Sequence, residues 1–251
     1  MSKEANASQP LIGRESTTVP GRFGEPLTVE HSVTSRGGFD QHATHPLFLC
    51  LHGWGSSEED MADIMRLIAP YNDFVALRGP LTLAPAREGS PDPGNYAWFH
   101  DALPIGDDRD YDAYAAATAV DRWVADNIPA DRDVVPLGFR KVAGRRAFVA
   151  YQSRAVPGRR LPVRLQHTRS VPGTAPADSR LADYDIPVFY TYGKNDGVIP
   201  KYELFATAAW LEEHTWLKTK SYHGLDHNVS LEEFADLRQW LLDNDITSGV
   251  L

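Results

Sequence analysis

The sequence contains a single cysteine, Cys50, among its 251 residues. One thiol cannot form a disulfide within the chain, and this is compatible with a reducing compartment. No apolar run approaches the roughly 20 residues that a membrane-spanning helix requires. Residues 1–17 also lack the apolar core of a secretory signal. We therefore expect a cytoplasmic protein without a membrane span.

Acidic residues outnumber basic ones: the sequence has 34 Asp and Glu but 25 Lys and Arg, which gives a formal net charge of −9 at pH 7. This balance argues against a nucleic-acid partner, since such a protein needs a basic surface to displace phosphate counterions. The length and the 42% hydrophobic content suit one core. We expect a polar, disordered tail over residues 1–26 and one domain over residues 27–246.

Short apolar runs alternate with helical patterns along the chain. The expected strands cover residues 47–51, 73–77, 134–139, 186–192 and 215–222. The expected helices follow Ser56, run over residues 116–127 and 202–210, and follow Ser230, with Leu231, Phe234, Leu237 and Leu241 facing inward. This order predicts an α/β fold with a mostly parallel central sheet, helices on both faces, and ligands beyond the carboxyl ends of the strands. Pro136 is unexpected in a central strand, because it lacks a ladder donor.

A nucleophile is missing where the pattern calls for one. The strand-like run over residues 134–139 leads toward a sharp strand-to-helix turn, at which a G-x-S-x-G sequence would expose a serine. Arg140, Lys141 and Val142 follow instead, so both the hydroxyl and the second glycine are absent. A guanidinium stays protonated and has no lone pair with which to attack a carbonyl carbon.

The composition changes abruptly at the same point. Residues 140–170 contain nine of the 25 basic residues and none of the 34 acidic ones. One interpretation is a basic arm that binds an acidic partner. The other is that the segment is translated out of frame and is irregular or non-native, with the frame restored between about residues 165 and 171. If residues 140–143 are encoded CGC-AAG-GTG-GCN, one T restored before them gives TCG-CAA-GGT-GGC, which reads Ser-Gln-Gly-Gly.

The acid and the base of a catalytic triad have candidates downstream. In an α/β-hydrolase the nucleophile, the acid and the base follow in that chain order, and Asp196 and then His227 follow the elbow position. Asp196 lies at an expected strand end, although a turn or helix-cap aspartate would look the same. His227 precedes the last helix, and His223 is the weaker candidate because it lies nearer the strand.

Residues 52–55, His-Gly-Trp-Gly, follow the first apolar strand. Their glycines let the backbone approach a ligand, and the Trp54 amide is a candidate oxyanion donor. The second donor is normally the amide after the nucleophile, which here belongs to Lys141. A plain glycine turn is the alternative for this segment.

Taken together, these motifs resemble the bacterial phospholipase/carboxylesterase family of α/β-hydrolases, whose relatives include acyl-protein thioesterases. The resemblance covers roughly residues 45–139 and 171–243, and it is carried by residues 51–60, 78–80, 96–99 and 136–139 with Asp196 and His227. It implies cofactor-free hydrolysis of a small-molecule ester by a Ser-His-Asp triad. It also places Trp54 on the oxyanion loop, and Trp98 and Phe99 beside the substrate.

Three functions follow as hypotheses. The first is a serine carboxylesterase that has lost its nucleophile to Arg140 and is catalytically impaired. The second is a non-catalytic binding protein on the same fold that uses residues 140–170, and the third is a related activity such as a lactonase or peptidase. No metal site is expected, because the acidic cluster over residues 107–112 does not fit a calcium loop, and His42 and His45 lack partners at ligand spacing. Cys50, inside an apolar strand, is interpreted as a core residue.

Overall fold

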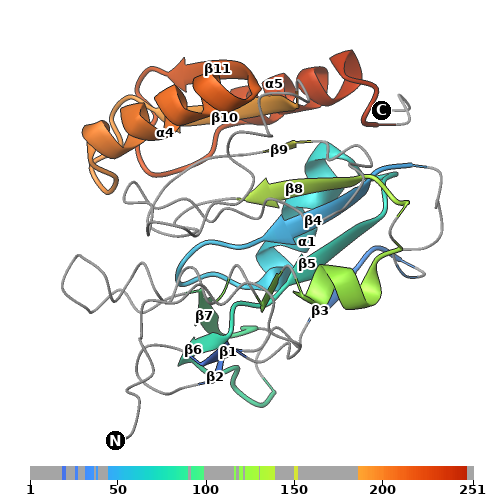
Figure 1. Ribbon diagram of the computed structural model, residues 1–251. Coiled ribbons are helices and arrows are strands. Elements are labelled where there is room, and N and C mark those ends of the chain that lie inside the picture. Colours follow the sequence, from blue (N-terminus) through green and yellow to red (C-terminus); the bar gives the residue numbers. More distant parts are fainter. Residues whose placement is uncertain are drawn as a thin grey trace, which may run out of the picture.

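The computed structural model describes residues 19–20, 26–27, 32–36, 38, 45–89, 92–98, 116, 119–120, 122–129, 131–138, 150–151 and 186–247 (Figure 1). The acidic cluster over residues 107–112, His42, most of the expected tail and most of residues 140–170 lie outside this set. None of the described helices is both long enough and apolar enough to cross a membrane.

Two groups of strands form the centre of the molecule. The first has the order β3-β5-β4-β8, with the bounds Ser32–Thr34, Phe74–Leu77, Leu47–Leu51 and Val134–Gly138. The second has the order β9-β10-β11, with the bounds Ala150–Tyr151, Pro187–Gly193 and Trp216–Tyr222. β4 is parallel to β5 and β8, and β10 is parallel to β11, whereas β3 and β9 are antiparallel to their neighbours. β8 contacts β9, which brings the two groups side by side (Figure 1). The predicted mostly parallel sheet is confirmed.

Two short antiparallel pairs flank this arrangement. One joins β1 (Val19–Pro20) to β2 (Pro26–Leu27), and the other joins β6 (Leu81–Ala84) to β7 (Asn95–Ala97).

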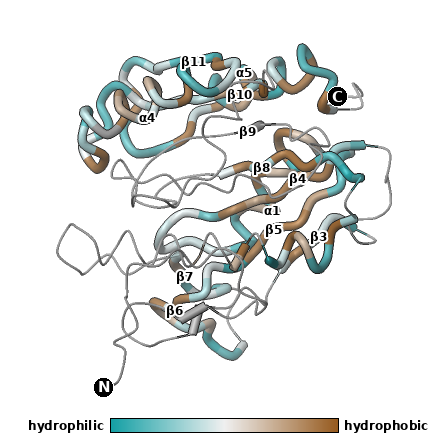
Figure 2. The backbone as a smooth tube through the Cα atoms, in the orientation of Figure 1, coloured by the Kyte–Doolittle hydropathy of each residue, from teal (hydrophilic) through white to brown (hydrophobic). Residues whose placement is uncertain are grey.

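β4 shows why a continuous apolar run marks a central strand. All five of its residues are buried, and they alternate between two cores. Leu47, Leu49 and Leu51 pack in one core with the helical residues Ala116, Ala119, Val120 and Trp123, while Phe48 and Cys50 pack on the side of two other helices. These are α1 (Glu58–Ile68) and α5 (Leu231–Asp243). Helices therefore cover both faces, as predicted, and β4 and β5 are among the most apolar segments in Figure 2. A third cluster joins β10 to α4 (Lys201–His214).

Two details of the helices differ from the expectation. α1 is capped by Ser57, whose hydroxyl accepts from the Asp60 amide while the Asp60 carboxylate accepts from the Ser57 amide. The expected cap, Ser56, is wrong by one residue, because Ser56 forms an isolated β-bridge with Tyr96. The helix can begin only after this bridge.

α5 is capped by Ser230 as predicted, but Leu231 does not face inward and is 83% exposed. At 100° per residue, Leu231 lies roughly 120° around the helix from the centre of the buried face. That face is formed by Glu233, Phe234, Leu237, Trp240 and Leu241.

Pro136 is buried in β8 opposite Leu49 of β4. Among the described residues β8 pairs with β4 alone, so Pro136 lies in an edge strand of the four-stranded sheet. In the described part of the chain no ladder joins β8 to β9, its neighbour on the other side, so the missing N–H of Pro136 interrupts none there.

A buried ion pair joins the segments that precede β5 and β8. The Arg132 guanidinium donates to the Asp73 carboxylate at 3.0 Å and to the His45 carbonyl at 3.1 Å. Both charged side chains are at most 3% exposed. The Asp73 carbonyl also accepts from the amide of Phe48 in β4, so the pair holds three strands at their amino ends.

We expect Arg132→Met to lower the free energy of unfolding by about 3 to 5 kcal/mol, because it leaves the Asp73 carboxylate buried without its cation. Urea denaturation measures this loss. Arg66→Met is the matched control, since Arg66 pairs with Asp63 on an exposed face and such pairs contribute at most about 1 kcal/mol. Equal effects of the two substitutions would contradict the prediction.

Candidate active site

Asp196 and His227 meet at the carboxyl ends of two adjacent strands. The His227 Nδ1 atom lies 3.2 Å from both carboxylate oxygens of Asp196. The Asp196 side chain is fully buried, and its Oδ1 accepts from the amides of Val198 at 2.9 Å and Ile199 at 3.2 Å. An Nδ1–H that donates to Asp196 leaves the lone pair of the imidazole on Nε2. The pair can therefore accept a proton at Nε2 and stabilise the imidazolium that results.

The register of the sheet brings these residues together. β10 and β11 pair in parallel over seven residue pairs, ending with Gly193 opposite Tyr222. The loops that follow are also bonded to each other, because the Lys194 amide donates to the Tyr222 carbonyl and the Asn195 amide donates to the Leu225 carbonyl.

Gly193 is required for this close approach. A Cβ atom at position 193 would lie 2.2 Å from the Leu225 carbonyl oxygen and 2.6 Å from that of Asp226. Neither contact is possible for a real side chain, so only glycine lets the His227 loop lie over the Asp196 loop.

The loop after β4 is held through the ring of His52, which is fully buried. His52 Nε2 accepts from the Gly79 amide at 2.8 Å, and Nδ1 lies 2.7 Å from the Gly53 carbonyl, so Nδ1 carries the proton. Burial lowers the pKa of His52 to about 4, and the ring is neutral at physiological pH. His52 thus joins the end of β4 to the turn after β5.

Trp98 supports the same loop from the other side. Its side chain is fully buried, and its indole N–H donates to the His52 carbonyl at 2.8 Å. The Gly55 amide donates to the Tyr96 carbonyl at 2.9 Å, and the Tyr96 amide donates to the Ser56 carbonyl at 3.0 Å. Trp54 lies between these anchors, with its side chain 38% exposed.

The structure therefore brings Asp196 and His227 into contact and places Trp54 and Trp98 around the loop after β4. Arg140, Lys141 and Phe99 lie outside the described residues. The roles of Trp54 as an oxyanion donor and of Trp98 beside a substrate remain predictions. His223 Nε2 lies 2.7 Å from Lys194 Nζ.

Three residues that support the site were not singled out from the sequence as supports: His52, Gly79 and Gly193. Nothing in the spacing distinguishes a histidine that holds its own loop by hydrogen bonds from one that faces a substrate. The steric need for glycine at positions 79 and 193 arises from segments distant in the chain.

Cys50 is a core residue as interpreted, and burial raises the pKa of its thiol. No group of three potential metal ligands occurs among the described residues.

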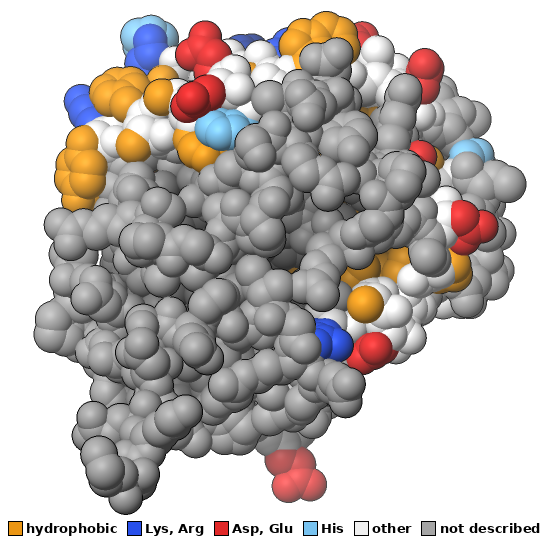
Figure 3. Space-filling model, in the orientation of Figure 1, with side chains coloured by type: hydrophobic (Ala, Val, Ile, Leu, Met, Phe, Trp, Pro, Cys, Tyr) orange, Lys and Arg blue, Asp and Glu red, His pale blue; other side chains and the backbone are white. Residues whose placement is uncertain are grey.

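Strand direction relates the two halves of the site. The arrowheads of β4, β8 and β11 point to the same side of the molecule in Figure 1. Trp54 follows β4, residue 140 follows β8 and His227 follows β11. Beside the Asp196 loop, α4 exposes Tyr202 and Phe205, and hydrophobic side chains are visible over this helix in Figure 3.

No protein-family model and no curated protein matches the sequence. Solved structures do resemble the chain. Acyl-protein thioesterase 2 of Zea mays has a TM-score of 0.57 and 19% identity, covering 85% of this chain and 98% of its own. A phospholipase/carboxylesterase of Dyadobacter fermentans has a TM-score of 0.54 and 17% identity, covering 86% and 98%.

A carboxylesterase of Bacillus cereus has a TM-score of 0.53 and 13% identity, covering 86% of this chain and 94% of its own. At these identities the likeness establishes the fold. The α/β-hydrolase fold implied by the motif series is therefore confirmed.

We expect Gly193→Ala to separate His227 from Asp196, because the new methyl group collides with the backbone of the His227 loop. The substitution should cost about 1 to 3 kcal/mol of unfolding free energy and abolish the hydrogen-bonded Nδ1 proton resonance of His227 in NMR spectra. Gly197→Ala is the control in the same loop, since a Cβ there meets no atom within 4 Å. Retention of the resonance in Gly193→Ala would contradict this account.

His52 predicts a specific dependence of stability on pH. Its folded pKa of about 4 lies below the ordinary histidine pKa of 6.5, so the folded state binds fewer protons between these values and stability rises with pH. The contribution is complete above about pH 6.5 and is lost as the pH falls toward about 4.

Relative to His52→Gln, we expect the parent chain to lose about 2 to 3 kcal/mol of unfolding free energy between about pH 7 and pH 4.5. Urea denaturation at several pH values measures the difference, and the variant removes the background titration of carboxylates from the comparison. Parallel pH profiles for the two proteins would show that His52 is not the cause.

Proposed function

We propose that this chain is a carboxylic ester hydrolase of the phospholipase/carboxylesterase type whose nucleophile position is occupied by Arg140. The observation that carries the proposal is the contact between His227 Nδ1 and the buried Asp196 carboxylate, at the strand ends and in the chain order that this mechanism needs. The fold shared with esterase structures supports it.

In the intact mechanism a serine at position 140 would attack the ester carbonyl carbon. His227 would accept the hydroxyl proton at Nε2 and then deliver it to the departing alkoxide, while Asp196 would keep the imidazole oriented. The amides of Trp54 and of residue 141 would donate to the oxyanion. Water would then attack the acyl-enzyme by the same proton transfers and release the acid. Trp98 and Phe99 would shape the substrate side of this loop.

Arg140 interrupts the first step only. The guanidinium supplies no nucleophilic lone pair, whereas the bonds described for Asp196, His227 and the loop after β4 join residues other than position 140. We accordingly interpret residues 140–170 as out of frame. The alternative is a binding protein in which this basic segment docks an acidic partner, favoured by its nine cations and lack of anions.

The decisive test compares the chain as written with a frame-restored chain. The restored gene receives one T before codon 140 and loses one nucleotide between about codons 165 and 171. We expect the restored chain to hydrolyse p-nitrophenyl acetate about 10⁶-fold faster than the chain as written, the loss seen on removing a triad nucleophile. His227→Ala in the restored chain should abolish the gain.

The chain as written should not exceed its own His227→Ala variant. Hydrolysis well above that control would refute the inactivity of the Arg140 form. An inactive but folded restored chain, combined with salt-sensitive binding that needs Arg154, Arg159 and Arg160, would favour the binding protein instead.

A further inference from the structure

The loop of residues 52–57 needs anchors outside itself. Trp54 stands between two glycines, Gly53 and Gly55, and Gly55 has a φ of +74°. Glycine backbones have more rotational freedom than any others, so this sequence alone does not fix the direction of the Trp54 amide. The hydrogen bond from the Gly79 amide to the ring of His52 anchors the start of the loop, and Tyr96 bonds its middle.

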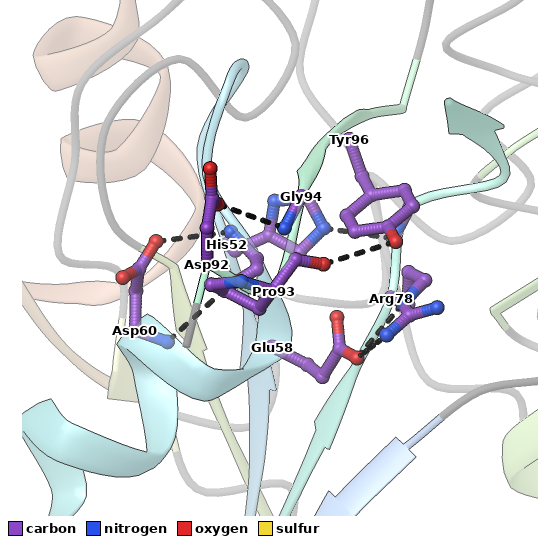
Figure 4. Close-up of polar contacts among 10 residues, drawn as sticks. His52, Glu58, Asp60, Arg78, Asp92, Pro93, Gly94 and Tyr96 are labelled. Carbon is purple, nitrogen blue, oxygen red and sulfur yellow. Dashed lines mark hydrogen bonds and ion pairs between the residues drawn. The ribbon is translucent and has the colours of Figure 1, made fainter. Parts of the chain in front are cut away.

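An ion pair lies at the far end of the loop. Glu58 is the first residue of α1, and its side chain is only 2% exposed. One carboxylate oxygen, Oε1, accepts from Arg78 Nε at 2.8 Å and also from Arg78 Nη2 (Figure 4). The other oxygen has no hydrogen-bond partner among the residues that the structure describes. The carboxylate of Glu58 therefore depends on Arg78 for its charge compensation.

Arg78 is itself fixed in place. Its guanidinium carbon lies 4.2 Å from the centroid of the Tyr96 ring, which gives a cation–π contact. Tyr96 is also the residue whose backbone pairs with Gly55 and Ser56. Figure 4 shows Glu58, Arg78 and Tyr96 gathered beside His52. Tyr96 therefore contacts both the Glu58–Arg78 ion pair, through its ring, and the loop, through its backbone.

The two links between the loop and the turn after β5 come from consecutive residues of the turn and reach opposite ends of the loop. His52 bonds to the Gly79 amide at the start of the loop, and Glu58 bonds to Arg78 just after its end. Arg78 and Gly79 are consecutive, so one short turn holds the loop at two points on either side of Trp54. Fixation at two points restricts the rotation that the flanking glycines would otherwise allow.

We propose that Glu58 and Arg78 are positioning residues that hold the Trp54 amide in the direction of an oxyanion. The inference rests on the proposed function, in which Trp54 supplies that amide. Arg78 fits this role better than lysine would, because its planar guanidinium can donate two bonds and stack on Tyr96 at the same time.

The first test uses the chain as written and measures amide hydrogen exchange. Arg78→Met should raise exchange at Gly55 and Gly79 at least about tenfold, because the Gly55 amide belongs to the loosened loop and the Gly79 amide donates to the His52 ring at its start. Amides of β10 and β11 should be unchanged, which shows that the fold is intact. Arg66→Met, which removes an exposed ion pair of α1, is the control and should change neither set.

The second test uses the frame-restored chain. Arg78→Met should lower kcat by about 10- to 100-fold with little change in KM, approaching the loss of one oxyanion donor. Arg78→Lys should recover only part of the rate. The double substitution of Glu58→Leu with Arg78→Met removes the buried charge and should recover stability without recovering kcat.

The outcomes separate the two proposals. Exchange at Gly55 and Gly79 within twofold of Arg66→Met would overturn the holding role. Faster exchange with an unchanged kcat in an active restored chain, or a double variant that recovers full kcat, would overturn the catalytic role. An inactive restored chain with Glu58 and Arg78 intact would refute the proposed function, and the exchange measurement would then still decide whether the pair holds the loop.

Discussion

The parallel pairing of β10 with β11 is the constraint on which the site depends. It ends both strands at one edge, with Gly193 opposite Tyr222, and places the two following loops in contact. Gly193 then permits a backbone approach that any side chain would block. Only with these loops in contact does His227 Nδ1 reach the buried Asp196 carboxylate at 3.2 Å. Strand register, and not the local sequence of either loop, therefore produces the contact between Asp196 and His227.

The second half of the site follows a different physical rule. The loop after β4 has no regular secondary structure, so its backbone groups must be bonded by groups from neighbouring segments. His52 fulfils this with a neutral ring that both donates and accepts, at the cost of a pKa lowered to about 4 by burial. Further bonds to this loop and its end come from Trp98, Tyr96 and the Glu58–Arg78 pair. Polar side chains here serve to fix a backbone direction.

The sequence predicted what depends on short-range pattern. The continuous apolar run of residues 47–51 indicated a strand covered on both faces, and the two faces of β4 do belong to separate cores. The Asp196 and His227 candidates came from their order and strand-end positions, and they lie in contact. The sequence could not predict what long-range packing decides. Ser56 failed as a helix cap because a bridge to Tyr96 uses its backbone. Leu231 failed as a core residue because it lies roughly 120° around α5 from the centre of the face that is buried.

The described bonds that hold Asp196 and His227 come from the loops at the ends of β10 and β11. Asp196 accepts from the amides of Val198 and Ile199. His227 contacts Asp196, and its loop accepts hydrogen bonds from the amides that follow β10. None of these bonds involves the turn after β8. A preorganised site of this kind requires no nucleophile to assemble it, since its dipoles are fixed by the fold before any reaction begins. Under the proposed function, replacement of a serine at position 140 would remove the attacking oxygen without removing any of these bonds.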